Sequence, residues 1–398
     1  MKRPIAAICL TAFLIANIAC QRGDNNLLTE PMFKLAVEKQ FNVAKQRLEV
    51  TQFAGLFNPP IDTTAVLFEQ KESGNAAQLY WEALKPRVET TAEETQRFLD
   101  ELSPVLQALN AAITANVPIS PNAISDEAVK KEAEKAAQLP ELAKLETGAQ
   151  RKYSRLVGEV VPIPENPMAL QPIPLTLLNS YAGALMVKGL LKEAAGDKAA
   201  AEKLLQTVIA IGQHFTQDPN YHHYFNGRAV MKFGCLGLKP FYQRQANTVK
   251  QQAVEQLEKA LDEQAQRLTA ELSARDDTGQ IFNIITSLGY LDEGIDPLMR
   301  IVGDENVPLA FRASALQTIY AGYMFRFMMV ERSGRAPETS EYAAPSQTRV
   351  QAFTRLAASP DKTLAEIATK SQQVLVKMQG LNNAERMKYW REISKPKS

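Results

Sequence analysis

The sequence has few of the residues that mark a specialised chemistry. It contains 3 cysteines and 2 tryptophans among 398 residues, and aromatic residues make up 7% of the chain. Three cysteines cannot form the framework of a disulfide-stapled domain, and a chain of this length buries a large core without one. The 45 Lys and Arg residues balance the 44 Asp and Glu residues, with no basic block. We therefore expect no nucleic-acid partner and no electrostatic attraction to a membrane.

Common catalytic motifs are also missing. The sequence has no phosphate-binding loop, no dinucleotide glycine fingerprint, no His-Glu-x-x-His and no Gly-x-Ser-x-Gly. Two Ser-x-x-Lys matches occur, at residues 359–362 and 394–397, without the companion motifs of hydrolases that use such a pair. Helix capping explains the first, with Ser359 as the predicted N-cap residue. We predict no catalytic residue, no metal site and no cofactor, and an enzyme with dispersed site residues stays an alternative.

The amino-terminal residues have the pattern of an export signal. Lys2 and Arg3 precede an apolar run over residues 5–16. This run is shorter than the about 20 residues that a membrane span needs. Residues 17–20 read Asn-Ile-Ala-Cys and resemble the lipobox of bacterial lipoproteins, in which small residues precede a cysteine that is lipidated and becomes the new amino terminus.

This resemblance implies a signal peptide over residues 1–19 and a Cys20 that carries fatty acid such as palmitate. Residues 21–26 are polar and rich in turn formers, as expected of a tether to the folded body, and we place this tether at residues 20–30. Gln21 after the cysteine implies, within this family, the outer membrane and a protein that faces the periplasm. Asn17 stands where the family usually has Leu, Val or Ile, and a chance cysteine beside an export signal is the alternative.

Hydrophobic periodicity is helical along almost the whole chain, so we predict an all-α protein. Thr91 and Glu94 form a capping box at the start of one helix. Residues 126–147, rich in Ala, Lys and Glu, predict a single exposed helix. Five prolines between residues 162 and 174 exclude a helix there and make either an ordered loop or a hinge.

The proline cluster divides the chain in our prediction. We expect an N-terminal helical domain over residues 31–161, a Pro-rich connection over residues 162–174, and a domain of stacked helical hairpins over residues 175–398. The architecture after the connection is predicted to be α-solenoid-like.

Two resemblances support the stacked hairpins. Two helices with apolar residues at helical spacing are predicted on either side of the Gly196-Asp197 turn. This pair is similar to a tetratricopeptide unit, which places small residues where its helices cross. A long amphipathic helix over residues 246–272 follows. Residues 281–316 resemble a HEAT repeat, and the residues that match its pattern are Pro297, Asp304 and Arg312.

A third likeness concerns an Asn-Ala-Ala-x-Leu-Tyr stretch over residues 75–80. Together with the Gly-Asp hairpin, it resembles a group of uncharacterised bacterial helical proteins. That likeness implies no activity.

All 3 histidines lie in one aromatic segment over residues 213–225. Their spacing is not that of a metal-ligand set, because adjacent residues of a helix point to different sides, and Asp218 has the pattern of a turn residue before Pro219. We predict a packed aromatic loop, with a ligand-binding lip as the alternative. The candidate ligand-binding residues here are His214, Tyr221, His222, His223 and Tyr224.

A second candidate binding region is the apolar stretch over residues 319–330. Its first interpretation is a buried central helix. The alternative is a groove for partner helices or lipid chains, since Met and aromatic side chains adapt to varied ligands. The candidate residues are Met324, Phe325 and Met328. Cys235, in an apolar context, is expected to be buried.

These patterns together predict a membrane-anchored lipoprotein of the cell envelope. Stacked helical hairpins form extended surfaces for other proteins, so we expect a non-catalytic interaction or scaffold module with an envelope protein as partner. A periplasmic helical binding protein for an apolar ligand is the alternative from another class.

Overall fold

The structure is a computed structural model of the chain. It describes residues 38–39, 41–46, 53–70, 72–115, 117–167, 175–273, 285, 287–289, 291–333 and 344–394. The predicted signal peptide, Cys20 and the predicted tether lie outside the described residues.

The described chain is almost entirely helical, which confirms the predicted all-α class. Within it, two short strands pair in parallel, with Glu72 opposite Arg151 and Asn75 opposite Tyr153. The elements are η1 (Phe53–Phe57), β1 (Glu72–Asn75), α3 (Ala77–Val88), α4 (Ala92–Thr114), η2 (Pro121–Ile124), α5 (Glu127–Ala137), α6 (Glu141–Ala149), β2 (Arg151–Tyr153), α7 (Leu175–Ala194), α8 (Lys198–Thr216), α9 (Tyr221–Arg244), α10 (Thr248–Ser273), η4 (Asp292–Gly294), α12 (Ile295–Gly303), α13 (Leu309–Ser333), α14 (Gln347–Leu356), α15 (Lys362–Gln379) and α16 (Asn383–Ile393).

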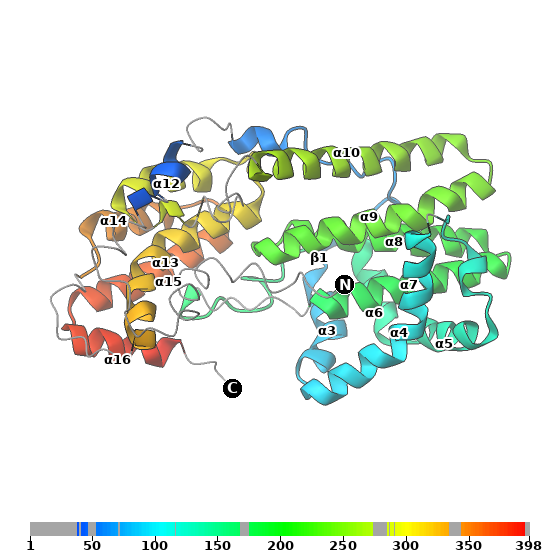
Figure 1. The fold of residues 1–398 in the computed structure, drawn as a ribbon, viewed down its shortest axis with the longest axis horizontal. Helices are drawn as coiled ribbons and strands as arrows, with labels where there is room; N and C mark the ends of the chain where they lie inside the picture. The colour runs from blue at the N-terminus through cyan, green and yellow to red at the C-terminus, as the bar shows by residue number, and fades with distance from the viewer. Residues whose placement is uncertain are drawn as a thin grey trace.

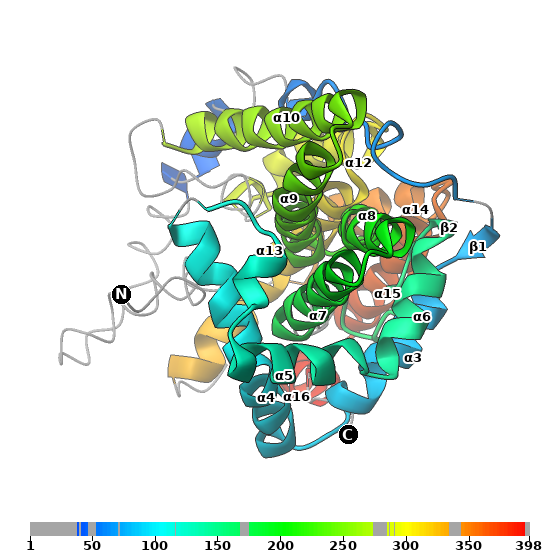
Figure 2. The same ribbon diagram turned by 90° about the vertical axis from the view of Figure 1, so that its right-hand side faces the viewer.

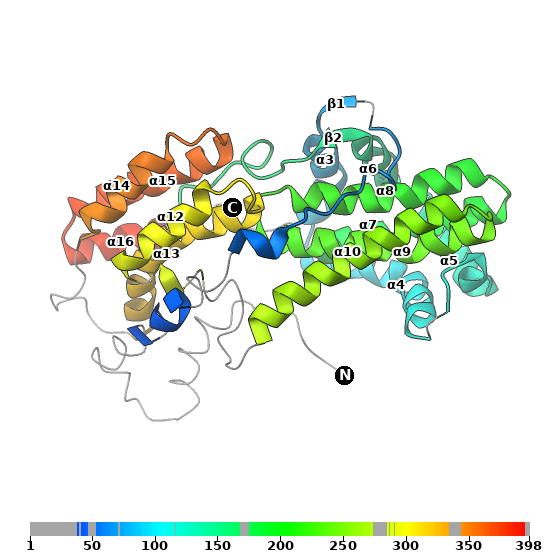
Figure 3. The same ribbon diagram turned by 90° about the horizontal axis from the view of Figure 1, so that it is seen from above.

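The helices form two lobes along the long axis of the molecule (Figure 1). The first lobe contains α3 to α10, and the second contains α12 to α16 together with helical residues 41–46 and η1. Seen from above, α9 and α10 extend from the first lobe toward the second (Figure 3). Tyr224 of α9 and Leu268 of α10 belong to the hydrophobic core of the second lobe. These two helices therefore join the lobes.

Helices α7 to α10 stack in chain order, each packed against the next (Figure 2). The turn between α7 and α8 has Gly196 at a φ of +81°, a conformation that glycine adopts without strain. Asp197 then accepts a hydrogen bond from the backbone N–H of Ala200 at 3.2 Å and caps α8. The stacking agrees with the predicted hairpins and with solenoid-like packing.

Helices α7 and α8 are central to the first lobe because both contribute to two hydrophobic cores. One core lies toward α3, α4 and α6 and contains the buried rings of Tyr80 and Tyr181. The other lies toward α5, α9 and α10 and contains Phe241 and Leu257. Helices that precede and follow the proline cluster thus pack on the same pair of helices, and the predicted division into domains stays a prediction.

Local signals explain several helix ends. Thr91 and Glu94 form the predicted capping box at the start of α4. The single helix expected over residues 126–147 is wrong, because the chain breaks at Pro140 into α5 and α6, and the second part buries Leu142 and Leu145. Proline lacks the N–H that a continuous helix requires.

The N-cap of α15 also differs from its prediction. Asp361, not Ser359, caps this helix by accepting hydrogen bonds from the backbone N–H groups of Thr363 and Leu364 at 3.0 and 3.1 Å. The hydroxyl of Ser359 instead accepts a hydrogen bond from the N–H of Asp361 at 3.3 Å.

An irregular segment over residues 154–167, here called the strap, runs from the first lobe along the second. The Nζ of Lys370 donates to the carbonyl oxygen of Ile163, and the amide of Gln317 donates to that of Pro167 at 2.9 Å. Ile163 is buried in the core of the second lobe. The described part of the proline cluster is therefore an ordered, packed segment.

Candidate functional site

The histidine segment is not a loop, as the sequence had predicted, but the junction of two helices. His214 lies in the last turn of α8, and His222 and His223 lie in the first turn of α9. Asn220 caps α9, because its side-chain oxygen accepts hydrogen bonds from the N–H groups of both residues, at 2.9 and 3.2 Å. The junction is thus formed by a strong N-cap a few residues after a helix ends.

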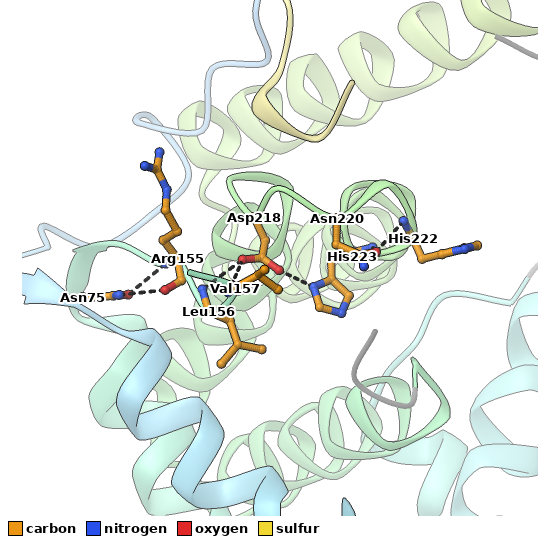
Figure 4. A network of polar contacts seen from close by, with 8 residues as sticks. All are labelled: Asn75, Arg155, Leu156, Val157, Asp218, Asn220, His222 and His223. Carbon is orange, nitrogen blue, oxygen red and sulfur yellow. Dashed lines mark hydrogen bonds and ion pairs between the residues drawn. The ribbon is translucent and has the colours of Figure 1, made fainter. Parts of the chain in front are cut away.

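Asp218 and His223 form a buried pair at this junction (Figure 4). The Nδ1 of His223 donates to Oδ2 of Asp218, and their side chains are 0% and 3% exposed. The other carboxylate oxygen, Oδ1, accepts hydrogen bonds from the backbone N–H groups of Leu156 and Val157, at 2.9 and 3.0 Å. Asp218 therefore has partners for both oxygens, as a buried carboxylate requires.

Side chains also accept hydrogen bonds from the neighbouring backbone N–H groups at the start of the strap. The N–H of Ser154 donates to Gln217 at 3.0 Å, and the N–H of Arg155 donates to Oδ1 of Asn75 at 2.8 Å. The amide of Asn75 also donates to the carbonyl oxygen of Arg155 at 2.8 Å (Figure 4). Four consecutive backbone N–H groups thus donate to side chains of the two residues that follow α8 and of the last residue of β1. The arrangement fixes the strap.

His214 lies in a second buried network. Its Nδ1 forms a hydrogen bond with the hydroxyl of Tyr80 at 2.7 Å, and its Nε2 lies 3.3 Å from the amide nitrogen of Gln70. Burial of the ring lowers the pKa of His214 to about 4, against a smaller opposing effect of a hydrogen bond to the backbone of Arg151. His214 is therefore neutral at physiological pH and connects α8 to α3.

The aromatic residues of the segment pack between the lobes. The rings of Tyr221 and Tyr224 meet the ring of Phe311 from α13 at centroid distances of 5.4 and 5.1 Å. Phe57 of η1 approaches the same ring at 4.8 Å. Tyr224 and Phe311 are 5% and 0% exposed. These contacts make the segment a junction between lobes.

The remaining candidates lie elsewhere. Met324 of α13 is 0% exposed and belongs to the same core as Tyr224. The side chains of Phe325 and Met328 lie outside the described residues.

Cys235 is a buried free cysteine in α9, and burial raises the pKa of its thiol to about 12. His222 is half-buried. Burial is the main cause that lowers the pKa of His222, and the charge of His223 lowers it further.

A groove with a volume of 490 Å³ lies between the strap and the second lobe. Its lining includes Pro162 and Pro164 of the strap, Lys370 of α15 and Tyr389 of α16. The hydroxyl of Tyr389 donates to Glu165 at 3.2 Å. Burial, together with the charge of Glu165, raises the pKa of Tyr389 to about 12. The polar side chains named here thus hold the strap in place.

Sequence reasoning missed the roles of Asp218 and Asn75. Asp218 was interpreted as a turn residue, yet it binds backbone groups 61 and 62 residues earlier in the chain. Asn75 binds Arg155 over a separation of 80 residues. The available signals were an Asp five residues before a His and the Asn-Ala-Ala-x-Leu-Tyr stretch, which supplies both Asn75 and Tyr80.

Two further observations concern metals and membranes. Among the described residues, no group of three or more His, Cys, Asp and Glu side chains is arranged to hold a metal ion. In that same part of the chain, every helix falls short of the length and apolarity that a membrane crossing requires.

No protein family model, no curated protein and no solved structure matches this chain.

Proposed function

We propose that the protein is a lipid-anchored component of the bacterial cell envelope, in which Cys20 holds a helical interaction or scaffold module at the membrane. The module faces the periplasm and binds an envelope protein. The observation that carries the interaction role is that the polar residues of the histidine segment are occupied by hydrogen bonds within the fold. Asp218, His223 and His214 are buried and bonded within the fold, where they organise the architecture.

The stacked helices supply the surface for such a partner. Helix α10 buries Val254, Leu257 and Leu261 against its neighbours in the first lobe, α9 above all, while its outward side is exposed and mostly polar. Val249 at its start is 76% exposed. Stacked hairpins of this kind present long helix faces that suit protein partners.

The anchor is tested by metabolic labelling with a palmitate analogue in the full-length protein. We expect the wild type to be labelled and membrane-bound, and Cys20→Ala to be unlabelled and released by a salt wash. Asn17→Leu restores the usual lipobox residue and is expected to raise the labelled fraction. An unlabelled wild type that fractionates like Cys20→Ala would rule out the anchor.

The partner is tested by affinity purification of the tagged, full-length protein from detergent-solubilised envelopes, followed by mass spectrometry. We expect one envelope protein in near-stoichiometric amount. Val249→Glu on α10 and Val376→Glu on α15 place the same charge on different lobes, at residues that are 76% and 48% exposed. Loss of the partner with one variant alone would map the binding face. Recovery of the protein alone, in repeated preparations, would contradict the scaffold role.

A further inference from the structure

The strap forms one wall of the 490 Å³ groove on the second lobe. Four consecutive strap residues, 162–165, line the groove from one side, and residues of α15 and α16 line it from the other. Proline fixes its own φ and keeps the residue before it extended, so the strap is extended around Pro162 and Pro164. Pro162 is exposed and Pro164 is partly exposed, whereas Ile163 between them is buried in the second lobe. The groove therefore follows an extended chain whose proline rings stay accessible.

This wall cannot pair with a ligand as a neighbouring β-strand would. A strand needs N–H and C=O groups in regular alternation on its neighbour. Pro162 and Pro164 have no N–H group, and the carbonyl oxygen of Ile163 accepts from the Nζ of Lys370. An ordinary extended peptide would bury N–H groups here without acceptors, at a cost in free energy. A proline-containing peptide has no N–H group at its prolines and avoids that cost.

The charged side chains of the lining have partners within the protein. The Nζ of Lys370 lies 3.1 Å from a carboxylate oxygen of Glu366, and Glu165 accepts from the hydroxyl of Tyr389 at 3.2 Å. A charged ligand would have to break these contacts or be buried without a partner, so the groove suits a neutral ligand. Gln373, which lines the groove from α15, is exposed, and its amide can donate to a ligand carbonyl oxygen.

The second lobe already holds one extended, proline-containing segment, namely the strap. The Nζ of Lys370 and the amide of Gln317 donate to the carbonyl oxygens of Ile163 and Pro167. Such a segment makes no hydrogen bonds within itself, which leaves its carbonyl oxygens free for side-chain donors. Aromatic residues line the grooves that bind proline-rich segments in other proteins, and Tyr389 is the aromatic residue of this groove.

We propose that the groove binds an extended, proline-containing segment of the envelope partner, which lies beside the strap. The proposal rests on the scaffold role proposed above and names the chemistry of its partner. Prolines of the ligand pack against the rings of Pro162, Pro164 and Tyr389, and the amide of Gln373 donates to a ligand carbonyl oxygen. Because a proline-rich chain is extended before it binds, it loses little conformational entropy on binding.

The test uses the full-length protein in non-ionic detergent and a fluorescent octaproline peptide, with binding followed by fluorescence anisotropy. We expect saturable binding, and binding at least about tenfold weaker for an equally neutral octapeptide of alternating Ala and Gln. Gln373→Arg places a long, charged side chain in the groove and is expected to weaken octaproline binding at least about tenfold. Gln351→Arg makes the same change at an exposed position of α14 and serves as the matched control, with the wild-type affinity.

A second variant changes the opposite wall. Pro162→Ala removes an exposed ring from the strap and is expected to weaken octaproline binding about threefold or more, with an unchanged circular dichroism spectrum. Absence of saturable binding to the wild type, equal binding of the two peptides, or wild-type affinity in Gln373→Arg would overturn the proposal.

Purification from envelopes separates this proposal from the scaffold role. A protein that binds octaproline but is recovered alone from envelopes would contradict the scaffold role and leave the proline site in place. A partner that Gln373→Arg retains in wild-type amount would leave the scaffold role in place and overturn the assignment of the groove to that partner.

Discussion

At the scale of single residues, Asp218 connects the junction of α8 and α9 to the strap. One carboxylate serves two backbone N–H groups of the strap and the ring of His223. Removing it leaves three buried donors without an acceptor. Unsatisfied buried donors cost free energy individually, so the loss exceeds that of an ordinary surface substitution.

We expect Asp218→Ala to lower the free energy of unfolding by about 3 kcal/mol or more. Asp218→Asn keeps one oxygen for the strap and is expected to cost less. Asp100→Ala removes an exposed carboxylate that bonds Gln96 on its own helix, and it serves as the control, with little change. Urea denaturation followed by circular dichroism measures all three, and equal losses for Asp218→Ala and Asp100→Ala would contradict the assigned role.

His214 makes stability depend on pH in a defined direction. Its pKa is about 4 in the folded protein and 6.5 for the unperturbed side chain. Between these values the unfolded chain binds the proton and the folded chain does not. The stabilisation is thus fully present above about pH 6.5 and is lost as the pH falls toward 4.

The contribution of His214 to the loss over this range is about 3 kcal/mol in the wild type. His214→Gln cannot titrate, so its unfolding free energy should fall less steeply with decreasing pH. Denaturant titrations at several values between pH 4 and pH 7 measure both slopes. Parallel curves for the two proteins would show that His214 is not the group responsible.

At the scale of helices, the close packing of α8 on α9 depends on glycine. A Cβ at Gly212 of α8 would lie 2.5 Å from the carbonyl oxygen of Gly227 and 2.6 Å from the backbone nitrogen of Met231, both on α9. A Cβ at Gly234 would lie 2.5 Å from a side-chain carbon of Ile209. The two helices therefore touch through backbone, which larger residues do not allow.

We expect Gly212→Ala to lower the free energy of unfolding by about 3 kcal/mol, because the added methyl group meets backbone that cannot move without separating the helices. Gly303→Ala at the end of α12 is the matched control, since a Cβ there meets nothing within 4 Å. It should be neutral or slightly stabilising. Thermal denaturation compares the two variants, and similar midpoints would show that α8 and α9 can separate at little cost.

The same glycines explain why the sequence did not reveal α9. Gly227, Gly234, Gly237 and Pro240 all lie within this helix and are individually unfavourable for helix formation. The small size of the three glycines lets α9 approach α8 and α7. Tertiary packing compensates for low intrinsic propensity here, whereas α4 and the turn between α7 and α8 carry local signals that sequence alone reveals.

At the scale of the whole molecule, the ring of Phe311 connects the lobes. It contacts aromatic rings from α9 and η1, and it belongs to the core of the second lobe. A fully buried aromatic residue of this kind is worth several kcal/mol. Its loss should affect both sides of the junction.

We expect Phe311→Ala to lower the free energy of unfolding by about 4 kcal/mol and to increase hydrogen exchange in α13 and in the first turn of α9. Phe353→Ala removes an equally buried ring from α14 in the second lobe and is the control. It should increase exchange in the second lobe only. Hydrogen exchange followed by mass spectrometry resolves these regions, and an unchanged first turn of α9 in Phe311→Ala would contradict the coupling.

The sequence by itself determined the helical class, the capping box at Thr91, the hairpin around Gly196 and the absence of helix in the described part of the proline cluster. These features depend on neighbours within a few residues, through periodicity, capping and the missing N–H of proline. Only the tertiary structure decided that Asn75 and Asp218 bind the strap, that His214 meets Tyr80, and that α9 is a helix. Those outcomes depend on groups more than 60 residues apart or on backbone contact between helices, and no local pattern encodes which partners the folded chain brings together.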